Sequence, residues 1–217
     1  MRTEIHSVGC GRTDTGVHAE QFFAHFDTDE TLDLDDFIYR LNSVLPREIA
    51  VQKMFEVAAD AHARFSALDR TYEYRLVLKK DPFSVNRRMY MRTPPDLIRM
   101  NEACKLLVGE KDFSCFSKSN TQTSTNLCNV MAANWVEDEK GPVFKIKANR
   151  FLRNMVRAIV GTCLEIGLGK QPPKHMGDVI ESKNRSFAGA SVEAHGLYLC
   201  QISYPETIFL AQHGRSK

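Results

Sequence analysis

The chain has 217 residues, a formal net charge of +2, and ordinary globular proportions of hydrophobic (43%) and charged (26%) residues, so extended disorder is not expected. No apolar run approaches the roughly 18 residues of a membrane span, and the opening MRTEIHSVGC lacks the apolar core of a secretion signal. The six cysteines are scattered, without C-x-x-C spacing or a histidine close enough to complete a zinc signature. We therefore predict a cytoplasmic protein with reduced thiols, no disulfide framework and no structural metal.

Hydrophobic periodicity predicts both strands and a helix in the first part of the chain. Strands are expected at 21–27, 49–57 and 70–80, and residues 34–45 carry apolar side chains at helical spacing before Pro46. In the strand at 70–80 tyrosine and leucine alternate with other residues, which predicts two different faces.

The second part of the chain adds helices and a hairpin. The expected elements are a helix N-capped by Asp96 and stopped at Gly109, strands 129–137 and 142–149 around the turn DEKG, helices 151–168 and 173–182, and a strand at 197–204. This mixture favours an α+β fold with an antiparallel mixed sheet and helices on one face. The stretch MRTPPD, 91–96, is the expected seam between an N-terminal half, 1–94, and a C-terminal half, 95–205, which a loose tail, 206–217, follows.

Charge is distributed unevenly along the sequence. Residues 20–60 carry ten acids, whereas 64–92 carry eight basic residues against three acids and 140–157 carry six basic residues and no acid. Aromatic residues are interleaved with both basic blocks, a pattern that suits a polyanion with stackable bases. Charge alone supports solvated surfaces equally well.

The stretch VGCGRTDTGVHAEQFFAHF, residues 8–26, concentrates polar chemistry around Asp14. Asp-Thr-Gly carries the acid of aspartic proteases, but that mechanism needs two carboxylates sharing a proton, and no second copy is present. Arg12 would also favour the ionised carboxylate. The loop also lacks the third glycine of a dinucleotide-binding motif and the lysine of a P-loop, which argues against a phosphate-binding loop. A purely structural role, in which Asp14 closes a turn between Gly11 and Gly16, remains an alternative, although a turn needs fewer polar neighbours.

Several motifs together resemble one known family. They are Gly11-Arg12-Thr13-Asp14-x-Gly16-Val17-His18-Ala19, His62-Ala63-Arg64-Phe65-Ser66-Ala67, Arg70-x-Tyr72-x-Tyr74, Gly109-Glu110-x-Asp112-Phe113, Asn149-x-Phe151, Met155-Val156-Arg157-x-Ile159-Val160-Gly161 and Gly196-Leu197-Tyr198-Leu199. In this order they resemble the tRNA pseudouridine synthase A family, the tRNA pseudouridine(38–40) synthases. Family members place a strand and a helix ahead of the first motif, so the chain resembles a truncated member. Uncovered apolar residues are then expected at 21–27 and 34–45.

The resemblance implies isomerisation of uridine to pseudouridine at positions 38–40 of the tRNA anticodon stem-loop. It makes Asp14 the essential carboxylate, either a nucleophile at C1′ or a base at C2′, and Arg157 its ion-pair partner. Tyr72 would stack on the extruded uracil, Leu197 would form an apolar wall under the base, and Arg12 would contact the nucleotide or its phosphate. The resemblance also implies that the two halves, 1–94 and 95–205, are related and flank an active-site cleft.

Two further basic residues, Arg150 and Arg153, are expected to neutralise RNA phosphates. The reaction requires no cofactor and no metal. The expected partners are tRNA, rather than DNA or a membrane, and a second copy of the chain in a homodimer. A catalytically idle tRNA-binding fragment of the same family is the alternative.

Overall fold

The computed structural model describes residues 4–118 and 125–210. The chain forms two compact units that do not follow its order. The first unit takes residues up to 11, 23–67 and from 204 onward, and the second takes 12–22 and 68–203. The expected halves, 1–94 and 95–205, stay a prediction.

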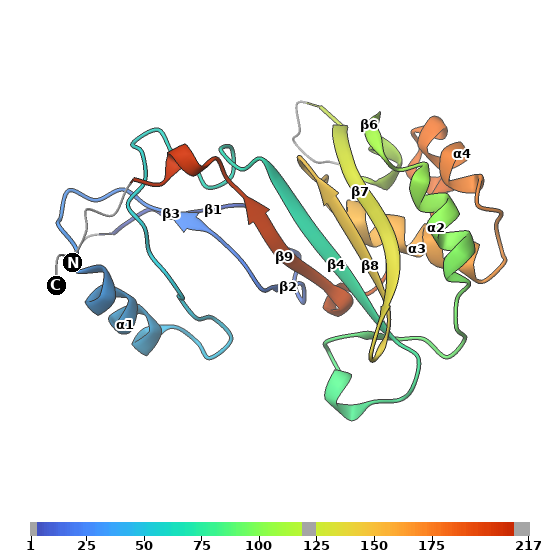
Figure 1. The fold of residues 1–217 in the computed structure, drawn as a ribbon, viewed down its shortest axis with the longest axis horizontal. Helices are drawn as coiled ribbons and strands as arrows, with labels where there is room; N and C mark the ends of the chain where they lie inside the picture. The colour runs from blue at the N-terminus through green and yellow to red at the C-terminus, as the bar shows by residue number, and fades with distance from the viewer. Residues whose placement is uncertain (1–3, 119–124, 211–217) are drawn as a thin grey trace. The chain divides into compact units, whose positions relative to one another are not determined.

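The second unit is built on a mixed sheet. Within the described residues, seven strands join in the order β2 (His18–Ala19), β9 (Leu197–Ser203), β4 (Asp69–Val77), β8 (Gly141–Ala148), β7 (Leu127–Asp138) and β6 (Gly109–Asp112), with β5 (Met89–Tyr90) against the end of β4. The helices are α2 (Leu97–Lys105), α3 (Met155–Gly167) and α4 (His175–Ser182). They lie together on one face of the sheet (Figure 1), which confirms the predicted α+β class.

Strand β4 shows the two faces that its alternation predicts. Tyr74 and Leu76 are fully buried in the core between sheet and helices. Glu73 and Arg75 point to the other face, where Arg75 Nη2 lies 2.8 Å from Glu73 Oε2 and Lys145 of the neighbouring strand lies 2.9 Å from Glu73 Oε1. The hydrophobic face therefore holds the helices, and the charged face carries one ion pair within β4 and one from β4 to β8.

Helix α3 is the central helix of this unit. Eleven of its thirteen residues are buried, including Ile159 and Gly161. It begins at Met155, not at 151 as predicted, because Asn154 has a left-handed backbone with φ of 69° and interrupts helical geometry. At Gly161 a Cβ atom would stand 1.8 Å from the carbonyl oxygen of Ala190, so only glycine allows this close approach.

Other boundaries differ from the predictions for local reasons. Asp96 caps α2 as expected, accepting from the backbone of Ile98 and Arg99, but the helix ends at Lys105. Gly109, expected as its stop, instead begins the unpredicted strand β6 with φ of 100°. Helix α4 begins at His175 rather than 173, because the turn at Pro172 and Pro173 closes with three-residue hydrogen bonds, from the His175 N–H to Pro172 O at 3.0 Å and from the Met176 N–H to Pro173 O at 3.3 Å.

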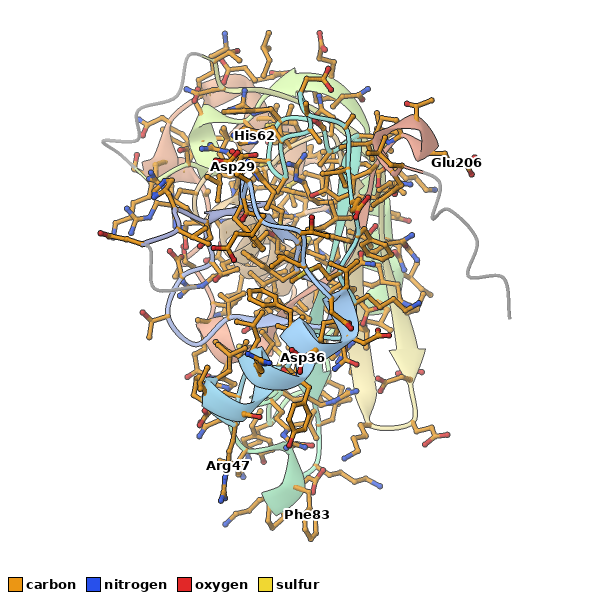
Figure 2. All side chains as sticks on the ribbon, turned by 90° about the vertical axis from the view of Figure 1, so that its left-hand side faces the viewer. Asp29, Asp36, Arg47, His62, Phe83 and Glu206 are labelled. Carbon is orange, nitrogen blue, oxygen red and sulfur yellow. The ribbon has the colours of Figure 1, made fainter. Side chains whose placement is uncertain are left out.

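Short 3-10 turns complete the second unit. They are η1 (Pro82–Ser84), η2 (Ser114–Phe116), η3 (Arg185–Phe187) and η4 (Ala194–Gly196). Phe83 of η1 is 84% exposed, and its ring points away from the ribbon (Figure 2). The segment that carries η1 therefore presents an apolar side chain to solvent.

The first unit has much less regular structure. It contains β1 (Val8–Gly9) paired with β3 (Ala24–His25), helix α1 (Leu34–Val44) capped by Asp33, and the turn η5 (Glu206–Ile208). The strand expected at 21–27 thus shrinks to two residues, and 49–57 contributes only the bridge of Val57 to Phe209. Apolar composition alone does not make a strand, because each strand also needs a hydrogen-bonding neighbour.

The first residues of the predicted tail have described structure. Residues 206–210 are tied to the first unit by η5 and by the Leu210 N–H, which donates to Glu56 O at 3.1 Å. The remainder, 211–217, lies outside the described residues. Across the described part of the chain, no helix is long and apolar enough to cross a membrane.

Candidate active site

The loop that carries Asp14 belongs to the second unit and leads directly into its sheet. The Val17 N–H donates to Asp14 O at 3.1 Å, and Gly16 has φ of 84°, so the backbone does close a turn here. His18 then begins β2, in parallel register with Tyr198 of β9. The turn uses only the backbone of Asp14, which leaves its carboxylate available for other contacts.

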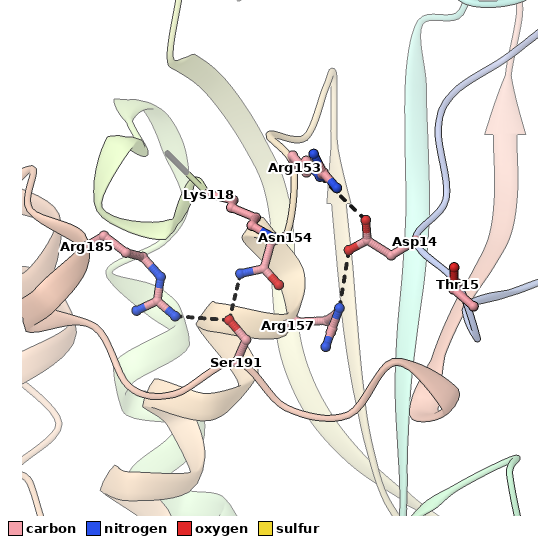
Figure 3. Close-up of a pocket in the computed structure, with 8 residues that line it drawn as sticks. All are labelled: Asp14, Thr15, Lys118, Arg153, Asn154, Arg157, Arg185 and Ser191. Atoms are coloured by element: carbon pink, nitrogen blue, oxygen red, sulfur yellow. Dashed lines mark hydrogen bonds and ion pairs between the residues drawn. The ribbon is translucent and has the colours of Figure 1, made fainter. Parts of the chain in front are cut away.

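Two guanidinium groups face that carboxylate. Arg157 Nη1 lies 3.2 Å from Asp14 Oδ2, and Arg153 Nε lies 3.6 Å from Asp14 Oδ1 (Figure 3). The side chains of Asp14 and Arg157 are 30% and 21% exposed, whereas that of Arg153 is 56% exposed. The pair of Asp14 and Arg157 is therefore better shielded from water than the pair of Asp14 and Arg153. Water screens a shielded ion pair less, so its attraction is stronger.

The segment of residues 189–192 packs across α3 and holds both the side chain and the backbone of Arg157. Its Nε donates to Val192 O at 2.7 Å, and the Val192 N–H donates to Arg157 O at 3.3 Å. The same segment lies directly on Gly161, and the Gly189 N–H donates to Thr162 Oγ1 at 2.9 Å. This fixed geometry presents the Nη1 end of Arg157 to Asp14.

The carboxylate lies in a cavity of about 550 Å³ in the second unit. Its lining residues are Asp14, Thr15, Lys118, Arg153, Asn154, Arg157, Arg185 and Ser191. Asn154 Nδ2 donates to Ser191 Oγ at 2.6 Å, and Arg185 Nη2 donates to the same oxygen at 2.9 Å (Figure 3). The cavity thus combines one carboxylate with four cationic side chains, a composition suited to an anionic ligand.

The other residues predicted for the site are not among the lining residues of this cavity. Tyr72 is half-buried on β4, with its ring edge-on to Phe151 at a centroid distance of 5.1 Å. Leu197 is 7% exposed at the start of β9. Arg12 is exposed and Arg150 is half-buried. Within the described residues, none of these four predicted residues lines the cavity, and Arg153, expected at a phosphate, faces Asp14 instead.

Sequence patterns did not identify the polar wall formed by Lys118, Asn154, Arg185 and Ser191. Arg185 begins the short turn η3 and Ser191 stands in the irregular segment after it, where no periodicity or motif marks a single arginine or serine. Asn154 offered a usable signal, because asparagine tolerates the left-handed conformation better than most residues and it directly precedes a long apolar helix.

A buried tyrosine packs beneath the segment that leads to β9. Tyr74 donates from its hydroxyl to Glu193 O at 2.8 Å, and a Cβ at Gly196 would stand 2.7 Å from the Tyr74 ring. Burial, with the nearby Glu193 carboxylate, raises the pKa of Tyr74 well above its usual range. Tyr74 is therefore a protonated structural donor that supports this segment.

Known proteins give independent information on this chain. The family model for tRNA pseudouridine synthase matches residues 103–205. The chain is 48% identical over 212 residues to tRNA pseudouridine synthase A of Parabacteroides distasonis, covering 96% of this chain and 83% of that protein. It is 46% identical over 211 residues to the protein of that name in Bacteroides fragilis, covering 96% and 84%. With that of Polynucleobacter asymbioticus it shares 38% identity over 214 residues, covering 96% and 78%.

Proposed function

Because this chain belongs to the tRNA pseudouridine synthase family, a family of isomerases, we propose that it converts uridine to pseudouridine at positions 38–40 of the tRNA anticodon stem-loop. In this reaction the bond between C1′ and N1 breaks, the uracil turns, and a bond forms between C1′ and C5. The C5 proton is lost and N1 gains one, so the product is an isomer of the substrate.

Asp14 is the carboxylate that acts on the sugar, by adding to C1′ or by removing the proton at C2′. The observation that carries the proposal is the contact between Asp14 Oδ2 and Arg157 Nη1 at 3.2 Å in a cavity rich in positive charge. A fixed guanidinium holds the carboxylate in one orientation, and either mechanism needs a carboxylate oxygen held steadily against the sugar.

The remaining roles follow from the same reaction. Tyr72 stacks on the extruded uracil, Leu197 supports the base from its apolar side, and Arg12 and Arg150 contact the RNA backbone. Arg153 divides its charge between Asp14 and the RNA. The protein works in the cytoplasm, where tRNA is modified. It acts as a homodimer, and light scattering would measure the mass of that dimer directly.

The test is release of tritium from tRNA labelled at C5 of uridine. Asp14→Asn fills the same space but can serve neither as nucleophile nor as base, so we expect turnover to fall by at least about a thousandfold. Its affinity for tRNA should stay within a few-fold of that of the wild type. Asp29→Asn, at an exposed acid of the first unit (Figure 2), is the matched control and should retain full turnover.

The idle tRNA-binding alternative makes the opposite prediction for the wild type. A wild-type protein that binds tRNA and releases no tritium would support that alternative. Substantial turnover by the Asp14→Asn protein would remove Asp14 from the mechanism while leaving the enzyme assignment standing.

A further inference from the structure

The cavity carries more positive charge than Asp14 can balance. Arg153 and Arg157 both face the Asp14 carboxylate. Arg185 instead donates to neutral oxygens, Ala188 O at 3.1 Å and Ser191 Oγ at 2.9 Å. Lys118, also in the lining, forms no ion pair with any residue in 4–118 or 125–210. The wall formed by Arg185, Ser191 and Lys118 therefore keeps its positive charge available for a ligand.

The Ser191 hydroxyl has a defined hydrogen-bonding state. A serine hydroxyl accepts two hydrogen bonds and donates one. Both acceptor sites of Ser191 Oγ are occupied, by Asn154 Nδ2 at 2.6 Å and Arg185 Nη2 at 2.9 Å. In the described part of the chain, no acceptor receives the Ser191 proton. Because Ser191 lines the cavity, that proton is a donor for a group bound there.

The donor is also fixed in position before any ligand arrives. Asn154 holds it from the start of α3, and Arg185 holds it from η3. The segment that carries Ser191 lies against Gly161, where a side chain would collide with Ala190 O. A donor fixed in this way loses little conformational entropy when it binds a ligand.

We propose that the Ser191 hydroxyl donates to a non-bridging phosphate oxygen of the RNA strand, at a linkage beside the reacting uridine, in a subsite charged by Arg185 and Lys118. A phosphate satisfies both features of this wall, because it accepts hydrogen bonds and is negatively charged, whereas a uracil carbonyl satisfies only the first. The assignment rests on the proposed function, which makes RNA the ligand of this cavity.

The test is a double-substitution cycle in RNA binding. A short anticodon stem-loop RNA receives one neutral methylphosphonate at a time, as separated stereoisomers, at each linkage flanking the target uridine. Dissociation constants are measured by fluorescence anisotropy for the wild type and for Ser191→Ala. At one linkage, and for one stereoisomer, the methylphosphonate should weaken RNA binding in both proteins. The factor by which it weakens binding should be about tenfold smaller for Ser191→Ala than for the wild type.

Two variants control the experiment. Ser186→Ala removes an exposed hydroxyl one residue from Arg185 that bonds Asn184 within its own turn, and it should show the wild-type pattern at every linkage. Ser191→Thr keeps a hydroxyl at the site and should restore most of the coupling. Loss of folding in Ser191→Ala would instead abolish binding of every RNA in the series, the unmodified stem-loop included.

Equal losses in the wild type and Ser191→Ala at all linkages would overturn the phosphate assignment, and the hydroxyl would then serve the base or the fold. This result is distinguishable from failure of the proposed function, because binding is measured without turnover. Tritium release by the wild type on the unmodified stem-loop tests the function separately.

Discussion

Helices α1 and α3 are predicted by the same signal, apolar residues at helical spacing, yet their surroundings differ completely. None of the eleven residues of α1 is buried, whereas eleven of the thirteen residues of α3 are. Periodicity therefore predicts that a stripe exists, but burial depends on what packs against it. In α3 the stripe meets β4 and α2, and in the described residues of the first unit only Cys10 and Ala63 are buried apolar residues.

The buried elements of the second unit can hold a site in a fixed geometry, whereas the exposed elements of the first unit cannot. Arg157 projects from α3, and its contact to Asp14 spans 143 positions of sequence. Such a contact keeps its geometry only when the elements that carry it are anchored in a common core. We infer that the second unit supplies most of the cooperative stability of the chain.

Matched isoleucine truncations give the largest expected difference between the two helices. Ile159→Ala in α3 removes a fully buried side chain and should lower the free energy of unfolding by about 2–5 kcal/mol. Ile38→Ala in α1 removes a half-buried one and should cost less than about 1 kcal/mol. Trp135, the single tryptophan, lies in the second unit, so its fluorescence follows that unit during denaturation. Equal losses for the two variants would contradict the comparison.

The same distinction explains how much of the fold followed from the sequence. Strand β4, the hairpin of β7 and β8, and the body of α3 have patterns long enough to reveal their faces, and these were predicted. Residues 49–57 are similarly apolar but lack a neighbouring strand beyond one bridge, so they stay irregular. Tertiary pairing, which composition does not contain, decided that case.

The candidate site divides along a similar line. Asp14 and Arg157 stand in motifs that a single sequence displays, and the structure brings them within 3.2 Å. Arg185 and Ser191 join them only because their segment folds back over α3 at two glycines, Gly161 and Gly189. A contact made by an irregular segment leaves no spacing rule in the sequence, so these residues required the coordinates.

Helix caps offer a second, smaller comparison. Asp33 and Asp96 cap α1 and α2 in the same way, each accepting from two backbone N–H groups of the first turn. Asp96→Ala should lower the free energy of unfolding by about 1 kcal/mol, as followed by Trp135 fluorescence. Trp135 reports on α2 because this helix packs on β7, the strand that carries Trp135. Asp33→Ala should reduce helical circular dichroism but leave the Trp135 transition unchanged. A shift of that transition by Asp33→Ala would show that the two units unfold together.

The smallest expected effect concerns charge on the outer face of the sheet. Burial alone would raise the pKa of Glu73, but hydrogen bonds from Lys145 and Arg75, together with their charges, outweigh burial and lower it. Glu20 shares Arg75, at 2.7 Å, and belongs to the same network. In the first unit, the pair of Asp36 and Arg40 is exposed on α1, where an ion pair contributes little.

The sign of the pH dependence follows from the lowered pKa. Above the ordinary glutamate pKa of 4.5, Glu73 is ionised in both states and its stabilisation is complete. As the pH falls below that value the unfolded chain binds the proton first, so the stabilisation is lost progressively until the pH has passed the lower pKa of the folded state. Glu73→Gln should therefore melt below the wild type at neutral pH, with a gap that narrows on acidification below about pH 4.5. Asp36→Asn should leave the Trp135 melting transition unchanged at neutral pH, because α1 does not contribute to the core that surrounds Trp135. A Glu73→Gln gap that stays constant from neutral to acidic pH would mean that the network does not stabilise the ionised form of Glu73.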